Sequence, residues 1–389
     1  MGNDLIRKAM DDLGKNFSKG KPLEKFHPLY EAIDGFLFTS GTLARKAPFI
    51  RDAWDLKRVM VIVVLALIPA TLFGIFNAGY QAQNALGLAH AWPDAVLRGL
   101  QIVLPVIFVS YAVGGFWEVL FACVRKHEIN EGFFVTGLLF ALTLPPHIPL
   151  WQVAAGISFG VVVGKEIFGG TGMNIVNPAL AGRAFLFFAY PAQMSGEAVW
   201  YGVDGLTRAT PLATMASVPA GTTGVAALQQ AGYTWSQLFY GFIPGSIGET
   251  SKLACLIGLA FLLITGVASW RIIVGCVAGL VSVASLIAFL HVKTVHPVLP
   301  FEWHLVMGGF AFGAIFMATD PVSASATTLG RWIYGFLIGA LVVFIRTFNP
   351  AYPEAVMLSI LLMNIFAPMI DHYVVEAHIN RRTPRAQAK

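Results

Sequence analysis

The chain has 389 residues, 56% of them hydrophobic and only 12% charged, and its mean hydropathy is +0.68. This composition is too apolar for a soluble globular protein and indicates a polytopic membrane protein; we expect no nucleic acid partner. The net charge is +5, and three cysteines without a C-x-x-C pair exclude a disulfide framework or an iron–sulfur cluster built by this chain alone.

Residues 1–58 are a polar arm with eleven lysine or arginine residues, from Arg7 to Arg58. Its apolar patches are short, so we expect neither a cleavable signal peptide nor a membrane span in it. A basic segment that flanks a hydrophobic region is expected on the cytoplasmic side.

Apolar runs that can cross a bilayer, at about 20 residues each, follow the arm. We expect ten spans, of which the third and fifth are short: 59–78, 101–123, 131–146, 150–168, 178–192, 253–269, 272–292, 303–319, 332–348 and 354–371. The expected fold class is an all-α polytopic membrane protein of ten transmembrane helices. Its expected parts are the arm 1–58, a first half 59–192, a loop 193–252, a second half 253–371 and a tail 372–389.

The basic residues are distributed unevenly over this topology. With the arm inside, twenty of the 26 lysine and arginine residues lie in inner segments or the adjoining helix ends. The other six are four outside, Arg98, Arg208, Lys252 and Lys293, and two within spans, Arg183 and Arg346. This asymmetry satisfies the positive-inside rule, so we expect both termini in the cytoplasm and residues 193–252 on the outer side.

Two patterns of the first half recur in the second. Six residues recur 176 positions later: Gly132, Phe134, Gly137, Phe140, Thr143 and Pro145 as Gly308, Phe310, Gly313, Phe316, Thr319 and Pro321. A second match pairs Asn177-Pro178-Ala179 with Asn349-Pro350-Ala351. Because each half holds an odd number of spans, the second half has the opposite orientation, and we expect an inverted repeat of two times five helices.

The loop between the halves contains the stretch Asp204-Gly-Leu-Thr-Arg-Ala-Thr210-Pro211. It resembles the D-G-x-[ST]-G-A-T box at which flavin transferases esterify FMN, through its phosphate, to the last threonine. The matching residues are Asp204, Gly205, Thr207, Ala209 and Thr210, whereas Arg208 stands in place of the usual glycine. Small neighbours suit this chemistry because they let the flavin donor approach the backbone. An ordinary threonine-rich loop is the alternative.

With the box, the spans and the repeat together, the chain resembles, nearly end to end, a family of redox-complex subunits. The family comprises the B subunit of the sodium-translocating NADH:quinone oxidoreductase and the related D subunit of the Rnf ferredoxin:NAD complex. The resemblance is carried by segments such as Val113-Gly-Gly-Phe-Trp-Glu118, Phe168-Gly-Gly-Thr-Gly172, Ile243-Pro-Gly-Ser-Ile-Gly-Glu249 and Ala318-Thr-Asp-Pro-Val-Ser-Ala-Ser325. The long arm and the Gly114-Gly115 stretch look closer to the quinone-reducing branch.

The resemblance implies a membrane flavoprotein that passes electrons from covalent FMN, through non-covalent riboflavin, to ubiquinone, coupled to Na⁺ export. It implies Thr210 as the FMN attachment site and Thr207 as unmodified; Arg208 either pairs with the phosphate diester or crowds the loop. It also implies partners in the bacterial inner membrane. These are an NADH-oxidising subunit with FAD and an iron–sulfur cluster, a second subunit with covalent FMN, and a flavin transferase for maturation.

Four further residues are expected to bind flavin or quinone, and each of them also has a structural alternative. By resemblance, Gly114 and Gly115 form a slot for the quinone head, although a glycine pair in a span also suits close helix packing. Asn174 and Asn177, in a glycine-rich inner loop, either hydrogen-bond a flavin or cap a broken helix.

Carboxylates inside spans are costly, and each is a functional hypothesis. The resemblance implicates four in Na⁺ handling: Glu31, Glu118, Asp320 and Asp371. Carboxylate and carbonyl oxygens suit hard cations. An alternative role for Asp320 is to cap the following Pro321-Val-Ser segment. Lys165 and Glu166 could simply form an ion pair with each other.

Two other function classes remain open. The twin Asn-Pro-Ala boxes also occur in aquaporin-type pores, so a channel or transporter without a redox role is one alternative; a flavoprotein would be yellow and a channel colourless. An Rnf-type subunit is the other, and reduction of quinone by the intact complex would separate it.

Overall fold

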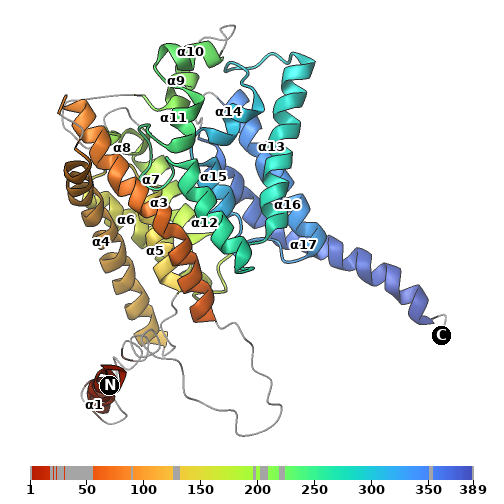
Figure 1. The fold of residues 1–389 in the computed structure, drawn as a ribbon. Helices are drawn as coiled ribbons and strands as arrows, with labels where there is room; N and C mark the ends of the chain where they lie inside the picture. Colours follow the sequence, from red (N-terminus) through yellow and green to blue (C-terminus); the bar gives the residue numbers. More distant parts are fainter. Residues whose placement is uncertain are drawn as a thin grey trace.

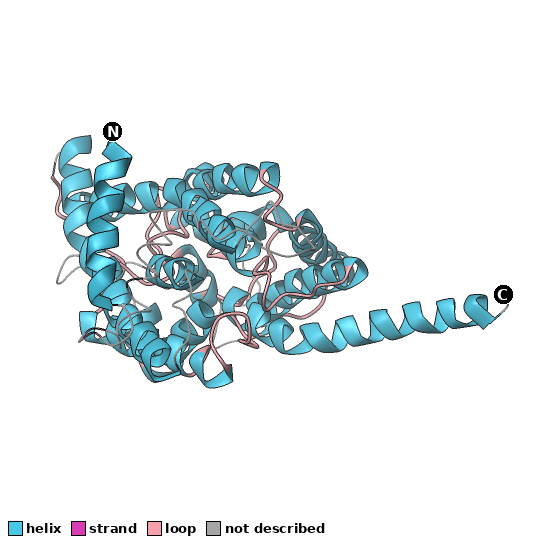
Figure 2. Ribbon diagram, turned by 90° about the horizontal axis from the view of Figure 1, so that it is seen from below, coloured by secondary structure: helices cyan, strands magenta, loops and turns pink. Residues whose placement is uncertain are grey.

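The computed structural model describes residues 2–17, 21, 23, 30, 56–88, 91–125, 132–195, 199–201, 209–218, 224–349 and 354–387. In these ranges every element of regular structure is a helix (Figure 2). The arm contributes α1 (Gly2–Phe17). Five helices make the first half: α3 (Leu56–Ala85), α4 (Trp92–Arg125), α5 (Gly132–Leu142), α6 (Leu150–Val162) and α7 (Pro178–Ala189), with a 3₁₀ turn η2 (Glu166–Phe168) after α6.

Four short helices connect the halves: α8 (Pro191–Ser195), α9 (Pro211–Ser217), α10 (Gly224–Gln230) and α11 (Trp235–Tyr240). The second half consists of α12 (Lys252–Ile264), α13 (Trp270–Leu290), α14 (Phe301–Val306), α15 (Phe310–Phe312), the π-helical segment η4 (Gly313–Met317), α16 (Thr328–Phe348) and α17 (Val356–Gln387). In Figure 1, α9 to α11 lie at the end of the bundle opposite to the start of α3 and the end of α17.

Among the described residues, six helices are long and apolar enough to cross a membrane, and α5, α7 and α12 are shorter apolar helices. The long ones expose large apolar side chains such as Phe108, Leu104 and Phe289. Such an apolar surface is costly in water and suits lipid. These helices confirm the expectation of an all-helical, polytopic membrane protein.

The expected span 303–319 is not one helix. It divides into α14, α15 and η4, and Gly308, with φ +58°, turns the chain between the first two. Arg346 donates to the carbonyls of His304 and Met307, both at 2.8 Å, and Lys252 Nζ donates to the Gly308 carbonyl at 2.9 Å. These buried cations satisfy carbonyl groups that the break deprives of helical partners, which makes a broken helix tolerable in a membrane.

The expected boundary between the last span and the tail, at residues 371 and 372, falls inside a continuous helix. α17 continues to Gln387, and its C-terminal part projects away from the bundle (Figures 1 and 2).

Corresponding helices pack in corresponding ways in the two halves. The second helix packs on the fourth in each half, as α4 on α6 and α13 on α16, and the fourth packs on the fifth, as α6 on α7 and α16 on α17. Across the halves, α3 packs on α12 and α7 on α17. Glycines allow the close approach of α13 and α16: a Cβ at Gly339 would meet the carbonyl of Cys276, and one at Gly279 that of Phe336.

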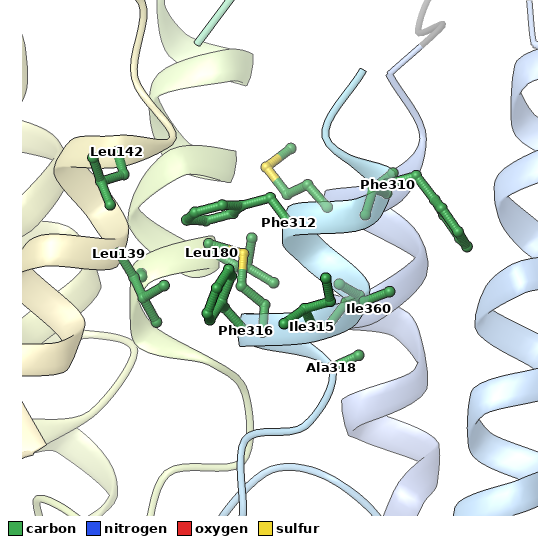
Figure 3. Close-up of a cluster of buried hydrophobic side chains, with 14 of the residues drawn as sticks. Leu139, Leu142, Leu180, Phe310, Phe312, Ile315, Phe316, Ala318 and Ile360 are labelled. Carbon is green, nitrogen blue, oxygen red and sulfur yellow. The ribbon is translucent and has the colours of Figure 1, made fainter. Parts of the chain in front are cut away.

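An apolar cluster fills the space between the halves (Figure 3). Phe312 and Phe316, from α15 and η4, point toward Leu139 and Leu142 of α5 and toward Leu180 of α7. All five side chains are buried. The cluster lies between two cavities, one at each end of the bundle.

Candidate functional site

The larger cavity, of about 380 Å³, lies beside α9 at the end of the bundle where the short connecting helices gather. Its walls are largely apolar, with side chains that include Phe187, Met194, Trp200, Leu212 and Ile243. Its polar lining residues include Thr210, Ser246, Glu249, Thr250, Lys252 and Glu354. We refer to it as the outer cavity. A mainly apolar cavity of this size with a few convergent polar groups is typical of a small-molecule site.

Thr210 lies in the wall of the outer cavity, where it is the N-cap residue of α9. Its Oγ1 accepts a hydrogen bond from the Ala213 amide at 3.2 Å. The carbonyl of the preceding residue, Ala209, accepts a hydrogen bond from the Tyr233 hydroxyl at 2.6 Å. These two bonds fix the end of the expected flavin box against α9 and α10. Its other residues, Asp204, Gly205, Thr207 and Arg208, lie outside the described residues, as does Glu31.

A largely buried ion network adjoins the outer cavity and includes three of its lining residues, Ser246, Glu249 and Glu354. Arg183, on α7, pairs with Glu249 at 2.9 Å and also with Glu354, and donates to Ser246 Oγ at 3.3 Å. Burial raises the pKa of Glu249 to about 7, and the charge of Arg183 opposes that rise. Lys252 Nζ donates to three backbone carbonyls, those of Glu249, Thr250 and Gly308. Arg183 lies within an apolar span, and a cation at such a position is the sequence feature from which this network could have been predicted.

Two polar groups of the outer-cavity wall have no hydrogen-bond partner in the described part of the chain. They are the indole N–H of Trp200 and the hydroxyl of Thr250, both in residues that are at least nine-tenths buried. Such groups cost free energy unless a ligand or water satisfies them. A flat flavin ring, which is a largely apolar body with polar edges, fits the volume and the apolar walls.

The smaller cavity, of about 80 Å³, lies between the halves on the other side of the apolar cluster. We refer to it as the inner cavity. Its polar lining residues come from both halves: Thr136, Lys165, Thr171, Asn174, Asn177, Thr319 and Asp320. The fold therefore brings two neighbouring predicted site residues, Asn174 and Asn177, together with a third that is distant in the sequence, Asp320.

The two asparagines of the inner cavity are occupied by local bonds. Asn177 caps α7, since its Oδ1 accepts from the amides of Ala179 at 3.0 Å and Leu180 at 3.3 Å. Asn174 Nδ2 donates to the Val176 carbonyl at 3.0 Å. The bonds of Asn177 are the capping role that formed the alternative to flavin binding, whereas the bond of Asn174 lies within the loop before α7. The inner cavity is smaller than the cavities of about 300 Å³ or more that ligands of drug size usually occupy. A flavin contact of Asn174 and Asn177 stays a prediction.

Asp320 follows η4 and closes a turn at the inner cavity. Its Oδ1 accepts from the Val322 amide at 3.1 Å, and its Oδ2 accepts from Ser323 Oγ at 2.7 Å. The expected capping role is therefore present. The carboxylate also lies in the cavity wall, so capping and cation binding are compatible.

Glu118 belongs to a cluster of four charged residues at the inner ends of α4 and α6, of which Glu118, Lys165 and Glu166 are buried and Arg125 is exposed. The Glu118 carboxylate pairs with Lys165, whose Nζ also donates to Thr171 Oγ1 at 3.0 Å and lies 3.8 Å from Glu166 Oε1. Glu166 in turn pairs with Arg125 at 3.1 Å. The mutual pair of Lys165 and Glu166 expected from the sequence is thus only one part of a larger network, in which Lys165 reaches Glu118.

Asp371 lies away from both cavities and holds the start of α16. Its carboxylate accepts four hydrogen bonds: from Ser325 Oγ and the Ala326 amide, each at 2.7 Å, and from the Thr327 amide at 3.0 Å and hydroxyl at 2.6 Å. These donors use most of the lone pairs that the carboxylate offers.

Gly114 and Gly115 differ in their surroundings. A Cβ at Gly114 would lie 2.5 Å from the ring of Phe133, whereas one at Gly115 would lie 3.6 Å from it. Phe133 thus fills the space next to Gly114. This is the close packing that we considered as the alternative to a quinone slot. A quinone head at Gly114 requires that Phe133 moves, while Gly115 is half-buried next to the exposed Phe116.

The comparisons with known proteins are consistent along the whole chain. Residues 43–380 match the model of the NQR2, RnfD, RnfE family. The chain is 52% identical to the B subunit of the Na(+)-translocating NADH-quinone reductase of Pseudomonas paraeruginosa, over 98% of this chain and 99% of the relative. It is also 52% identical to the proteins of the same name from Chromohalobacter salexigens, over 98% and 97%, and from Azotobacter vinelandii, over 98% and 99%.

Proposed function

The chain belongs to the NQR2, RnfD, RnfE family, and we propose that it works as the membrane-embedded B subunit of a Na⁺-translocating NADH-quinone reductase. The resemblance stated from the sequence is thereby confirmed. Identity of 52% over nearly the full length of relatives with this name favours the quinone-reducing branch over an Rnf-type subunit and over a channel without a redox role.

The architecture that supports this function is a pair of inverted five-helix repeats with ten spans. In support, α14, α15 and η4 together take the place of the eighth span, and the same helix pairs pack within each half. The cross-packing of first helix with first and fifth with fifth is what a two-fold axis in the membrane plane requires.

The proposed topology places residues 1–58 and 372–389 in the bacterial cytoplasm and residues 193–252 on the outer side of the inner membrane. The charge asymmetry of the sequence supports it. In support, α9 to α11 lie at the bundle end opposite to the start of α3 (Figure 1).

One observation carries the proposal of a flavin site: Thr210, the last residue of the expected attachment box, lines the outer cavity. FMN esterified through its phosphate to Thr210 would supply an electron carrier there. The chain's own contribution is to exclude water with apolar walls, among them Phe187, Trp200 and Leu212. Lys252 lines the cavity, and Arg183 pairs with two of its lining residues, Glu249 and Glu354, so positive charge lies near a bound ring and stabilises negative charge on it.

The inner cavity suits a cation instead. Its volume is that of a few water molecules, and its wall offers the Asp320 carboxylate and the hydroxyls of Thr136 and Thr319. We infer that Na⁺ enters the protein here and passes between the two halves. The cluster of Phe312, Phe316 and Leu139 would then be the barrier that must open during transport (Figure 3). Glu118 lies behind this cavity, within reach of Lys165.

Other expected elements of the function are part of the same proposal. Ubiquinone approaches the half-buried Gly115 and the exposed Phe116 on the lipid-facing side of α4. Riboflavin is held without a covalent bond, and Asn174 and Asn177 in the wall of the inner cavity are the residues expected to contact it. Electrons arrive from partner subunits, among them an NADH-oxidising subunit with FAD and an iron–sulfur cluster and a second subunit with covalent FMN.

Thr210→Val tests the flavin site, because valine keeps the shape of the side chain and removes the hydroxyl that the phosphate esterifies. The purified, denatured chain of this variant should lose flavin fluorescence in a gel. Thr207→Val is the matched control in the same box and should keep it. Undiminished fluorescence in Thr210→Val would place the flavin on another residue and overturn this part of the proposal.

A further inference from the structure

Lys165 places an ammonium group between a buried carboxylate and the inner cavity. The residue follows α6, and its relative exposure is 2%. Its Nζ pairs with Glu118 and donates to Thr171 Oγ1 at 3.0 Å. Lys165 and Thr171 line the inner cavity, whereas Glu118 is not among the described residues in its wall. A cation in the cavity therefore meets Lys165 before it can meet Glu118.

The oxygens that hold this ammonium are suitable ligands for sodium. A carboxylate and a hydroxyl are hard oxygen donors, as Na⁺ requires. An ammonium ion carries the same single charge as Na⁺ and binds the same kinds of oxygen. Lys165 is thus a covalently attached cation that already occupies a cation site.

A second carboxylate lies within reach of the same ammonium. Glu166 Oε1 is 3.8 Å from Lys165 Nζ. Arg125 pairs with Glu166 Oε2 at 3.1 Å and donates to the Glu166 carbonyl at 2.7 Å. Glu166 therefore keeps a cationic partner whether or not Lys165 is near it, so the lysine is free to be shared between the two carboxylates. A lysine side chain has a flexible stem with three rotatable donors and suits such a displacement.

We propose that Lys165 is a built-in competitor of sodium: its ammonium occupies the cation site at Glu118 and leaves toward Glu166 when Na⁺ enters from the inner cavity. This inference rests on the proposed function, in which Glu118 takes part in sodium handling. Asp320 lies in the wall of the same cavity and offsets the additional positive charge during the exchange. Return of the ammonium to Glu118 expels the ion, so the affinity for Na⁺ stays low enough for release.

The direction of the effect separates this role from a structural salt bridge. Lys165→Met keeps the apolar stem and removes the competing charge, so Glu118 should bind Na⁺ more tightly. In the assembled complex, we expect the Na⁺ concentration for half-maximal quinone reduction to fall about tenfold or more. We also expect a lower maximal rate, because release becomes slower. Damage to packing alone would leave the half-saturating concentration unchanged or raise it.

Lys252→Met is the matched control. Lys252 is also a buried lysine, with 3% exposure, but its ammonium binds backbone carbonyls. It should lower stability and, because Lys252 lines the outer cavity, also the rate, but it should not lower the half-saturating Na⁺ concentration. An unchanged half-saturating concentration in Lys165→Met with normal flavin content, or an equal fall in both variants, overturns the inference.

A second comparison keeps the test decisive if Lys165→Met does not assemble. Glu118→Gln alone leaves the ammonium facing the cavity without its carboxylate, so the half-saturating Na⁺ concentration should rise. Lys165→Met combined with Glu118→Gln removes both charges and should raise it less. Equal values for these two variants refute the role of Lys165. No effect of Glu118→Gln, by contrast, refutes the sodium role of Glu118 and with it that part of the proposed function.

Discussion

Arg183 Nη1 lies 2.9 Å from Glu249 Oε1, and this buried pair joins α7 to the segment that precedes α12. The same guanidinium pairs with Glu354, just before α17. One arginine thus ties the last helix of the first half to two entry points of the second half. Both carboxylates line the outer cavity, so Arg183 holds the interface together and also positions two wall residues of the proposed flavin site.

Arg183→Met should therefore destabilise the protein strongly. The substitution leaves Glu249, with 6% exposure, as a buried carboxylate without its cation, which typically costs about 3–5 kcal/mol. We expect a marked fall in the thermal unfolding temperature of the purified complex, and the double variant with Glu249→Gln should recover part of it. Arg271→Met is the control, because Arg271 is half-buried over the ring of Trp270. Equal stability of the two single variants would contradict the bridging role.

The glycine pair on α4 allows a direct comparison of packing and quinone binding. Gly114→Ala places a methyl group 2.5 Å from the Phe133 ring and should cost about 1–3 kcal/mol of stability through overpacking. Gly115→Ala meets Phe133 at an ordinary 3.6 Å and should leave stability unchanged. If quinone approaches Gly115, this second variant should raise the KM for quinone. An unchanged KM in Gly115→Ala would move the quinone site away from the pair.

Asp371→Asn should act on helix stability. The amide cannot accept all four hydrogen bonds that the carboxylate accepts from Ser325, Ala326 and Thr327. We expect a loss of about 1–3 kcal/mol in unfolding free energy, with faster hydrogen exchange at the start of α16. A raised half-saturating Na⁺ concentration at normal stability would instead return Asp371 to the sodium role implied by resemblance.

The topology can be tested with an impermeant thiol reagent in cells whose outer membrane has been made permeable. Cys123, Cys255 and Cys276 are first replaced, and Asp204→Cys then introduces a single thiol in the expected outer segment. It should react without lysis of the inner membrane. Thr383→Cys, exposed near the end of α17, should react only after lysis. The reverse pattern would mean that the topology is inverted. Thr210 would then lie on the side of the membrane where the flavin transferase does not work.

Hydrophobic run length and the distribution of charge determined much of the fold from the sequence alone. Apolar runs gave the positions of the helices, because a span must bury its backbone polar groups in its own hydrogen bonds. The exception is the run 303–319. Its composition is that of a span, but buried cations from Lys252 and Arg346, distant in sequence, satisfy the carbonyls at its break.

The sequence by itself also determined the family, because the segments that carry the resemblance are short and contiguous. Examples are the Asp204–Thr210 box and the glycine-rich loop before Asn177. Which of these residues meet was decided only by the tertiary structure. Glu118 could have been paired with several cations, and its contact with Lys165 follows from the packing of α4 on α6. Likewise, Asp320 and Asn174 share a cavity because the two halves close against each other around an apolar cluster. Ion pairs and cavities depend on distances of a few ångströms between helices, and a one-dimensional pattern of residues does not encode such distances.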